Sequence, residues 1–503
     1  MSTRAAMDGM RRRIVLGLLA CMLGALIVFA CLRTSEPHDA PRGEAPAAAA
    51  SASASASASA SIARPAPAVP GSASAPTASS STVVPAPKLS LKRTLRVVGT
   101  GWDTLAAALL ANEGIDTAPG CAMWKAGLDV HVTPSSADKS VESALARGGE
   151  DKDGADIGVL PLPDFVAAYE RMRALSPQIF FVTGWSRGRE GLWSQRDSLL
   201  NVPAKGLTLG GSRNDASMFL ALFTLDLAGV PAGSIAVPAA DKQPVFFSGD
   251  RRDEAQAPGK LLLTTADAPR LVPLVAVAQA AFVEKHGDAL GAWVKAWLQG
   301  QARIQSDAAE GARRIGAMQG APEPLTLVRR LGEIAPASLY DNARATNLSG
   351  RSPVTLDQLF ARTWKLWRAS RVLTIPAPEA PPVLPGIIAG LVRSNPELAA
   401  PPVADPKVQP RGETAPVLLS YRIAKGKLDE PSLVAEAGLL AGIFERSGLR
   451  VAVFGGAGVD DVRTRKLIQA TVDRFELPAG RLAVAKGVQG DAGSTLIEIL
   501  SVP

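Results

Sequence analysis

Two tracts rich in Ala, Ser and Pro divide this chain of 503 residues into segments that differ in their ability to form a hydrophobic core. The first tract, residues 35–93, has few large apolar side chains, so we expect a disordered spacer there. The second, residues 374–416, predicts a Pro-rich interdomain linker, within which Leu384 to Val392 has the composition of a short helix. Folded domains are therefore expected at residues 94–373 and 417–503.

Residues 1–34 have the features of an anchoring segment. Arg11 to Arg13 precede an apolar run from Ile14 to Leu32, which is long enough to cross a bilayer as a helix. Positive charges before such a run keep that end cytoplasmic, so the body is expected in the periplasm, held by a single membrane helix. A lipid anchor at Cys21 or Cys31 is the alternative, because a lipobox-like stretch precedes each cysteine.

Charge and histidine usage argue against several classes of function. The net charge is +7, but much of the excess lies at the extreme N-terminus, and no basic block with interleaved aromatics follows. The usual footprint of nucleic-acid binding is therefore missing. The three histidines, His38, His131 and His286, lack the spacing of a metal site and a plausible nucleophile. We expect no metal, no cofactor and no enzymatic activity.

The segment 94–373 alternates short apolar runs with amphipathic ones, which predicts an α/β fold with a largely parallel sheet. The predicted strands are Leu95–Gly99, Asp129–Val132, Ile157–Leu160, Ile179–Thr183, Leu207–Leu209 and Leu261–Thr265. The predicted helices include Thr104–Asn112, Ser140–Ala146, Asp215–Ala228 and Ala289–Gln299. In the last of these, Leu290, Trp293, Val294, Trp297 and Leu298 share one face, so the two tryptophans are interpreted as core.

The C-terminal segment predicts a smaller α/β sandwich with the order β-α-β-α-β-β. Its strands are expected at Val417–Ile423, Arg450–Phe454, Arg481–Ala485 and Thr495–Leu500. Its helices are expected at Pro431–Glu445 and Asp460–Phe475.

The loop after the first predicted strand carries candidate ligand-binding residues. Gly101, Trp102 and Asp103 offer a turn, an aromatic face and a carboxylate at a position where open α/β sheets bind ligands. The dinucleotide pattern fails because Thr104 stands at the third glycine position. Trp102 is interpreted either as a platform for the ligand or as packing.

A second candidate site precedes a predicted helix, at Gly211, Ser212, Arg213 and Asn214. A glycine turn that exposes N–H groups at a helix N-terminus predicts an anion site. Ser212 and Asp215 have the spacing of a capping box, so a well-capped helix without a ligand is the alternative.

Two further loops complete the set of candidates. After another strand, Ser186 and Arg187 occur together, and Arg187 is expected either to hold an anionic group or to fix a hinge. Thr265 and Asp267 end a strand where the chain is expected to cross between two lobes, and Asp267 is alternatively a turn cap. No base and nucleophile accompany these loops, so covalent catalysis has no support.

Four stretches, taken in order, resemble the periplasmic substrate-binding proteins of ABC importers, in the branch for nitrate, sulfonates, taurine and thiamine precursors. They are Gly101-Trp102, Gly154 to Gly158, Gly184 to Gly188, and Lys205-Gly206-Leu207 leading to Gly211-Ser212. The resemblance covers residues 94–373 and implies a type II periplasmic-binding-protein fold, in which two α/β lobes enclose a cleft. It also implies a small-molecule solute and an ABC permease as partners.

The C-terminal segment is similar in outline to the OmpA-like peptidoglycan-associated domain, by its order of elements and by Asp473 to Leu482. That family holds the peptide carboxylates of the cell wall with an Asp and an Arg. The approximate counterparts here are Asp461, or alternatively Asp460, and Arg465, or alternatively Arg463. The shortened loop Gly455 to Gly458 departs from the family pattern, so the resemblance leaves open whether this domain still binds peptidoglycan.

These observations predict an envelope solute-binding protein that captures a small, anionic solute for ABC import and whose C-terminal domain associates with the cell wall. The alternative is a structural or sensory envelope protein that keeps the two-lobed fold without a transported solute. An enzyme of the thiamine-precursor type is disfavoured, because the chain is poor in His and Cys.

Overall fold

The computed structural model describes residues 91–135, 138–238, 242–255, 257–401, 415–456 and 458–501. The predicted membrane segment at 1–34 and nearly all of the predicted spacer therefore lie outside the described residues. Within the described ranges, no helix is both long enough and apolar enough to cross a membrane.

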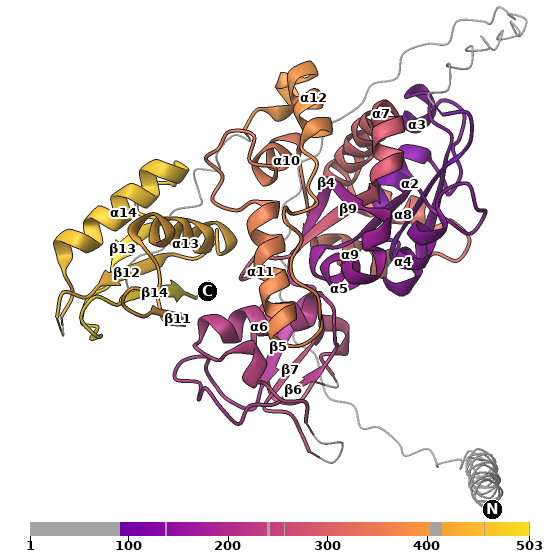
Figure 1. Cartoon of the computed structure of the whole chain (residues 1–503). Coiled ribbons are helices and arrows are strands. Elements are labelled where there is room, and N and C mark those ends of the chain that lie inside the picture. Colours follow the sequence, from indigo (N-terminus) through magenta and orange to yellow (C-terminus); the bar gives the residue numbers. More distant parts are fainter. Residues whose placement is uncertain are drawn as a thin grey trace, which may run out of the picture. The chain divides into compact units, whose positions relative to one another are not determined.

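The first lobe is built on a six-stranded sheet with the order β10-β4-β9-β3-β1-β2. Its strands β4 and β9 are labelled in Figure 1. β1, β2 and β3 are parallel, whereas β9 is antiparallel to both of its neighbours, β3 and β4. The strands are β1 (Leu95–Thr100), β2 (Val130–Ser135), β3 (Ile157–Pro161), β4 (Pro177–Ser186), β9 (Pro273–Gln279) and β10 (Ile334–Pro336).

Helices cover both faces of this sheet because successive strand residues point to opposite sides. On one face, Val97 belongs to a core with α2 (Ala106–Asn112) and α7 (Ala280–Ser306). On the other face, Val98 packs with α4 (Asp138–Arg147) and α5 (Leu162–Met172). The first core also contains α3, α8 and α9, which span Ala122–Lys125, Ala308–Gly316 and Pro324–Gly332.

The apolar face predicted within residues 289–299 is part of α7. Trp293 and Trp297 are buried, and Trp293 lies edge-on to Phe181 of β4 with a centroid separation of 6.2 Å. The interpretation of these tryptophans as core is confirmed.

The second lobe has a four-stranded sheet with the order β6-β7-β5-β8. Its strands are β5 (Glu190–Ser194), β6 (Leu209–Gly211), β7 (Phe246–Asp250) and β8 (Lys260–Thr264), and helix α6 (Ala216–Leu227) packs on the sheet. The chain crosses between the lobes twice, from β4 to β5 and from β8 to β9. The expected crossing after Thr265 is therefore present.

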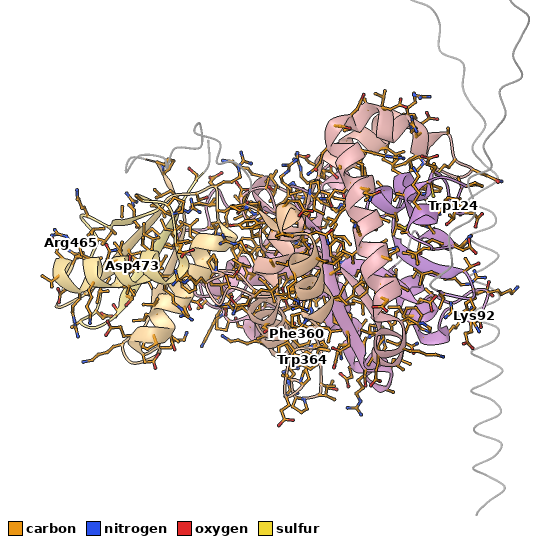
Figure 2. The ribbon with its side chains drawn as sticks, turned by 90° about the horizontal axis from the view of Figure 1, so that it is seen from above. Lys92, Trp124, Phe360, Trp364, Arg465 and Asp473 are labelled. Carbon is orange, nitrogen blue, oxygen red and sulfur yellow. The ribbon has the colours of Figure 1, made fainter. Side chains whose placement is uncertain are left out.

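Helix α11 (Leu356–Ala369) contacts both lobes, because it packs against α5 of the first lobe and α6 of the second (Figure 1). Phe360 and Trp364 are neighbours on this helix, with stacked rings 5.6 Å apart (Figure 2). Helix α10 (Leu339–Ala345) precedes it and packs on β4.

The structure differs from the predicted boundaries of the first folded domain. The N–H of Ile179 in β4 donates to Pro382 O at 2.8 Å, and the N–H of Leu384 donates to Ile179 O at 2.8 Å. Helix α12 (Gly386–Ser394) follows and buries Ile388, so residues 374–401 belong to the first lobe rather than to a free linker. The short apolar run within this Pro-rich tract is enough to hold it against the sheet.

The C-terminal domain has a four-stranded sheet with the order β11-β14-β12-β13. Its elements are β11 (Val417–Ile423), α13 (Glu430–Ile443), β12 (Leu449–Val453), α14 (Asp461–Phe475), β13 (Leu482–Val484) and β14 (Thr495–Leu500). The predicted β-α-β-α-β-β order is confirmed. The predicted fold class, two α/β lobes followed by a small α/β sandwich, is confirmed with it.

Candidate functional site

A cavity of about 680 Å³ lies between the two lobes. The first lobe lines it with the carboxyl ends of β1, β2 and β3 and with α9, and the second lobe lines it with the start of α6 and the end of β7. The polar and charged lining residues are Thr100, Asp103, Ser135, Asp164, Arg189, Glu190, Ser212, Asp215, Ser217, Asp250, Arg252, Thr326 and Arg330.

The turn after β1 brings three predicted residues, Gly101, Trp102 and Asp103, to this cleft. Gly101 has φ +94°, a conformation that L-residues with a side chain rarely adopt, and its N–H donates to Ser135 O at 2.8 Å. This bond joins the ends of the parallel strands β1 and β2, so Trp102 and Asp103 lie at the edge where open α/β sheets bind ligands.

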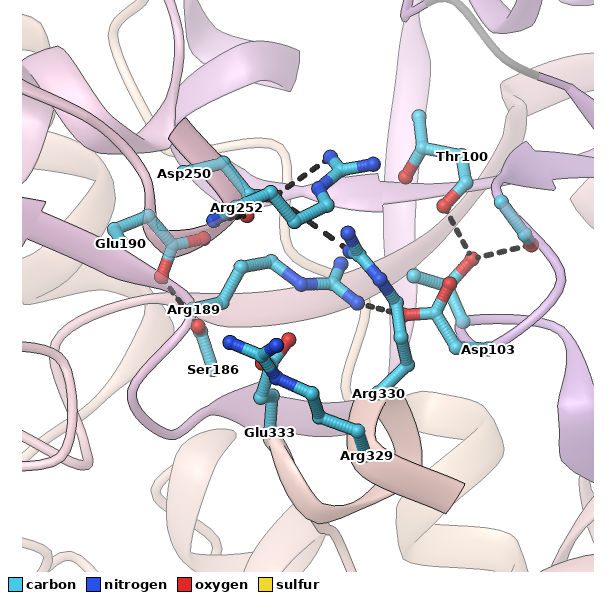
Figure 3. A network of polar contacts seen from close by, with 12 residues as sticks. Thr100, Asp103, Ser186, Arg189, Glu190, Asp250, Arg252, Arg329, Arg330 and Glu333 are labelled. Atoms are coloured by element: carbon cyan, nitrogen blue, oxygen red, sulfur yellow. Dashed lines mark hydrogen bonds and ion pairs between the residues drawn. The ribbon is translucent and has the colours of Figure 1, made fainter. Parts of the chain in front are cut away.

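Arg189, in the first crossing, forms an ion pair with Asp103 of the first lobe (Figure 3). The exposed fractions of the two side chains are only 12% and 7%. Burial lowers the pKa of Arg189, because the charged guanidinium has lost most of its water. This buried ion pair therefore links the first crossing, between β4 and β5, to the loop after β1.

Glu190 begins β5 and is buried beneath the cleft. Its carboxyl group accepts a hydrogen bond from Ser186 Oγ (Figure 3). It accepts a second, at 3.0 Å, from Thr265 Oγ1. The N–H of Gly188 donates to Thr265 Oγ1 at 2.8 Å, so the two crossings are joined at this point. Burial raises the pKa of Glu190 despite these donors and the nearby charge of Arg189.

Asp250, at the end of β7, is shared by two arginines from different lobes. Arg252 Nη2 lies 2.6 Å from its carboxylate, and Arg330 Nη1 of α9 lies 3.6 Å from it (Figure 3). Burial alone would raise the pKa of Asp250, but the hydrogen bonds from Arg252 and the charges of both arginines lower it. Burial lowers the pKa of Arg330. Asp250 therefore interacts with one arginine from each lobe, and Glu333 adds a second negative charge near Arg330.

Four of the predicted binding residues line the cleft: Gly101, Trp102, Asp103 and Ser212. Ser186 and Thr265 are brought together, 3.2 Å apart, but they hold Glu190 from below instead of lining the cavity.

The other predicted residues have local contacts outside the cavity lining. Arg187 is exposed and donates to Gly332 O at 3.1 Å, and Asp267 accepts from the N–H of Thr264 at 2.8 Å, as expected for the turn cap. Gly211 has φ +96°, and an added Cβ would lie 1.9 Å from Ser248 O, so this glycine permits close pairing of β6 with β7. Arg213 and Asn214 are exposed.

The capping box predicted for Ser212 and Asp215 is wrong. Asp215 is itself the N-cap of α6 and accepts from the N–H of Met218 at 3.0 Å. Ser212 instead donates its N–H to Ser248 O at 3.0 Å, because the chain is still paired with β7 at this position.

Sequence reasoning missed Arg189, Glu190, Asp250, Arg252 and Arg330. One signal was available, since Arg189 and Glu190 directly precede the apolar stretch Gly191-Leu192-Trp193, and charged residues are almost never fully buried unless paired. The partners of these residues could not be found this way, because Arg189 and Asp103 meet only through the fold.

In the C-terminal domain, Asp461 and Arg465 lie on exposed turns of α14, where their side chains are 3.6 Å apart (Figure 2 labels Arg465). Asp460 is the N-cap of this helix and accepts from the N–H of Arg463 at 3.0 Å. Across the described ranges, no group of three or more His, Cys, Asp or Glu side chains has an arrangement that could hold a metal ion.

No protein-family model and no curated protein matches this chain. Solved structures that this chain matches include a Candida albicans protein described as exhibiting the generic periplasmic binding protein structural fold. It is 12% identical to this chain, and the alignment covers 60% of this chain and 95% of the Candida protein with a TM-score of 0.39.

Two further similar structures are named for their ligands. The periplasmic aliphatic sulphonate binding protein of Escherichia coli is 15% identical, covers 56% of this chain and 88% of its own, and has a TM-score of 0.39. The periplasmic nitrate-binding protein of Synechocystis is 15% identical, covers 59% of this chain and 93% of its own, and has a TM-score of 0.36.

Proposed function

We propose that this chain is a solute-binding protein of the cell envelope whose cleft captures a small anionic solute. The observation that carries the proposal is the meeting of Arg252 and Arg330, from opposite lobes, on one side of a cavity between them. Guanidinium groups bind carboxylate, sulfonate and phosphate groups by charge-assisted, often bidentate, hydrogen bonds.

The anionic group would bind between these two arginines and take over part of their interaction with Asp250. Because one arginine belongs to each lobe, a bound anion would draw the lobes together, which is how two-lobed proteins close over ligands. Trp102 lines the same cavity and offers an apolar face to the rest of the solute. Arg189 and Asp103 would keep the floor of the cleft neutral.

The wider role follows from the predicted ends of the chain. The N-terminal segment would anchor the protein to the membrane, as a helix or a lipid anchor, with its body in the periplasm near an ABC permease. The C-terminal domain would associate with peptidoglycan through Asp461 and Arg465.

A structural or sensory envelope protein is the second candidate, and one observation favours it. The ion pairs Arg189–Asp103 and Arg330–Asp250 already join the lobes without a solute. These ion pairs would keep the cleft closed in the absence of a ligand.

A thermal-shift measurement on the full chain tests the proposal, with phosphate, nitrate, sulfate, taurine and alkanesulfonates as probes. A ligand at 100 times its Kd should stabilise the protein by about 2.7 kcal/mol. Saturable stabilisation by one class of anion is the expected result. If none of the probes changes the melting temperature of the folded protein, the structural or sensory role becomes the better account.

The neighbouring residues Arg330 and Arg329 provide a matched pair of variants for the same measurement. Arg330→Gln should weaken binding of the active anion at least about tenfold, since it removes a buried charge-assisted partner. Arg329→Gln should leave binding unchanged, because Arg329 is 66% exposed and contacts Glu333 at 3.6 Å. Equal losses in both variants would mean that general positive charge, and not this site, attracts the anion.

A further inference from the structure

The C-terminal domain contacts the hinge of the two-lobed domain through Arg270. This residue lies in the second crossing, between β8 and β9. Its Nε donates to Glu445 of the C-terminal domain at 2.9 Å, and its guanidinium lies 3.2 Å from Asp341 of α10. It also lies over the ring of Trp185, at the end of β4, with 5.3 Å between guanidinium carbon and ring centroid. One side chain of the second crossing therefore touches two elements of the first lobe, β4 and α10, and the C-terminal domain.

Arg362 of α11 makes a second contact of the same kind. Its guanidinium pairs with Glu436 of α13 and lies 3.6 Å from Asp226 of α6, in the second lobe. Only 11% of the Arg362 side chain is exposed, so water screens these pairs weakly.

Apolar side chains also pack where the C-terminal domain meets the two-lobed domain. Phe444, just after α13, stacks on Phe223 of α6 with 6.5 Å between ring centroids, and both rings are buried. Gly442 allows the close approach, because an added Cβ would lie 2.4 Å from the side chain of Val354. The backbone N–H of Arg270 donates to Ile443 O at 3.3 Å. We call this set of contacts, made by residues 436–445 with Arg270, Arg362, Phe223 and Val354, the hinge contact.

From this geometry we propose that the C-terminal domain controls the opening of the cleft by holding the hinge. Rotation of the second lobe would move α6 relative to α10. Residues 436–445 are tied to both, because Glu436 shares Arg362 with Asp226 of α6 and Glu445 shares Arg270 with Asp341 of α10. Opening would therefore break or strain the hinge contact, so an undocked C-terminal domain leaves the lobes freer to separate. Coupling of this kind is reciprocal, so opening the cleft also weakens docking. The proposal does not depend on the identity of any solute.

Hydrogen exchange of the full chain in the absence of solute tests this. The double variant Glu436→Gln, Glu445→Gln removes two charges from the hinge contact while Arg270 keeps Asp341 and Arg362 keeps Asp226. Gly442→Leu separates the surfaces sterically without changing charge. Glu430→Gln is the matched control, because Glu430 begins the same helix but pairs with Lys466 inside the C-terminal domain at 2.9 Å.

The informative amides are those that line the cleft, at residues 100–104 and 248–252, far in sequence from the substitutions. Both test variants should exchange at least about threefold faster there than the wild type, while Glu430→Gln exchanges at the wild-type rate. Unchanged protection of residues 449–453 in β12 verifies that the C-terminal domain remains folded.

Two outcomes would overturn the proposal. Faster exchange confined to residues 223–226 and 436–445, with the cleft unchanged, would mean that the domain undocks without effect on the lobes. No change at residues 436–445 in either test variant would mean that these contacts do not hold the domain in place.

Discussion

At the scale of single residues, Glu190 lies in surroundings that disfavour its charged form. It is a carboxylic acid at the base of the cleft, and burial raises its pKa. The folded chain therefore keeps the proton of Glu190 at pH values where the unfolded chain has released it. The stabilisation from this retained proton is complete well below the unfolded-state pKa of about 4.3, and it is lost as the pH rises through the folded-state pKa.

Glu190→Gln should therefore be more stable than the wild type at pH 8, by about 1 kcal/mol, because the amide accepts the same hydroxyl donors without a buried charge. The difference should shrink as the pH falls toward 4. Thermal unfolding of both proteins across this range measures it.

Glu170→Gln serves as a control of opposite sign. Hydrogen bonds from Thr374 lower the pKa of the half-buried Glu170, so that variant should lose stability at pH 8 and match the wild type at low pH. If Glu190→Gln also lost stability at pH 8, the pairing of Glu190 with Arg189 would outweigh the cost of its burial.

At the scale of elements, helix α10 completes the pairing of β4. β10 pairs with β4 only at residues 184–186, and the side chain of Asn342 continues the pairing at Val182. Asn342 Oδ1 accepts from the N–H of Val182 at 2.7 Å, and Nδ2 donates to Val182 O at 2.9 Å. A buried side-chain amide thus replaces a strand.

Asn342→Ala should destabilise the protein by about 2–4 kcal/mol, since it leaves both backbone groups of Val182 buried without partners. Asn395→Ala is the matched control and should cost less than about 1 kcal/mol, because the Asn395 amide bonds only to the end of its own helix. Calorimetric melting temperatures of the two variants compare them. Similar losses would show that the Val182 groups find water or another partner.

The elements that could be predicted from the sequence are those with a local signal. The apolar face at residues 289–299 and the alternation that predicts β1 to β3 depend on neighbours along the chain. Asn342, in contrast, meets Val182 across 160 residues, and its sequence surroundings are those of an ordinary helical asparagine. The same holds for the site, where Trp102 and Asp103 were found from the strand before them, while Arg189, Asp250 and Arg330 are brought to the cleft by tertiary structure.

At the scale of the whole molecule, the first lobe extends to residue 401, past the end of the predicted domain. A chain of residues 91–401 should therefore be more stable than one of residues 91–373, by at least about 2 kcal/mol. The shorter chain loses the burial of Ile388 and two backbone hydrogen bonds to Ile179. Thermal unfolding of the two chains tests this. Equal melting temperatures would mean that residues 374–401 are a linker and add nothing to the stability of the first lobe.

The second lobe is attached to the first through two strands that lie side by side. β4 leaves the first lobe at Ser186, β9 enters it at Pro273, and Trp185 and Pro273 are partners in the ladder between these strands. A rigid body fixed at two adjacent points can turn about the line through them but cannot slide or translate. The two crossings therefore favour rotation of the lobes about this line, and a solute that closes the cleft would act on the angle between the lobes.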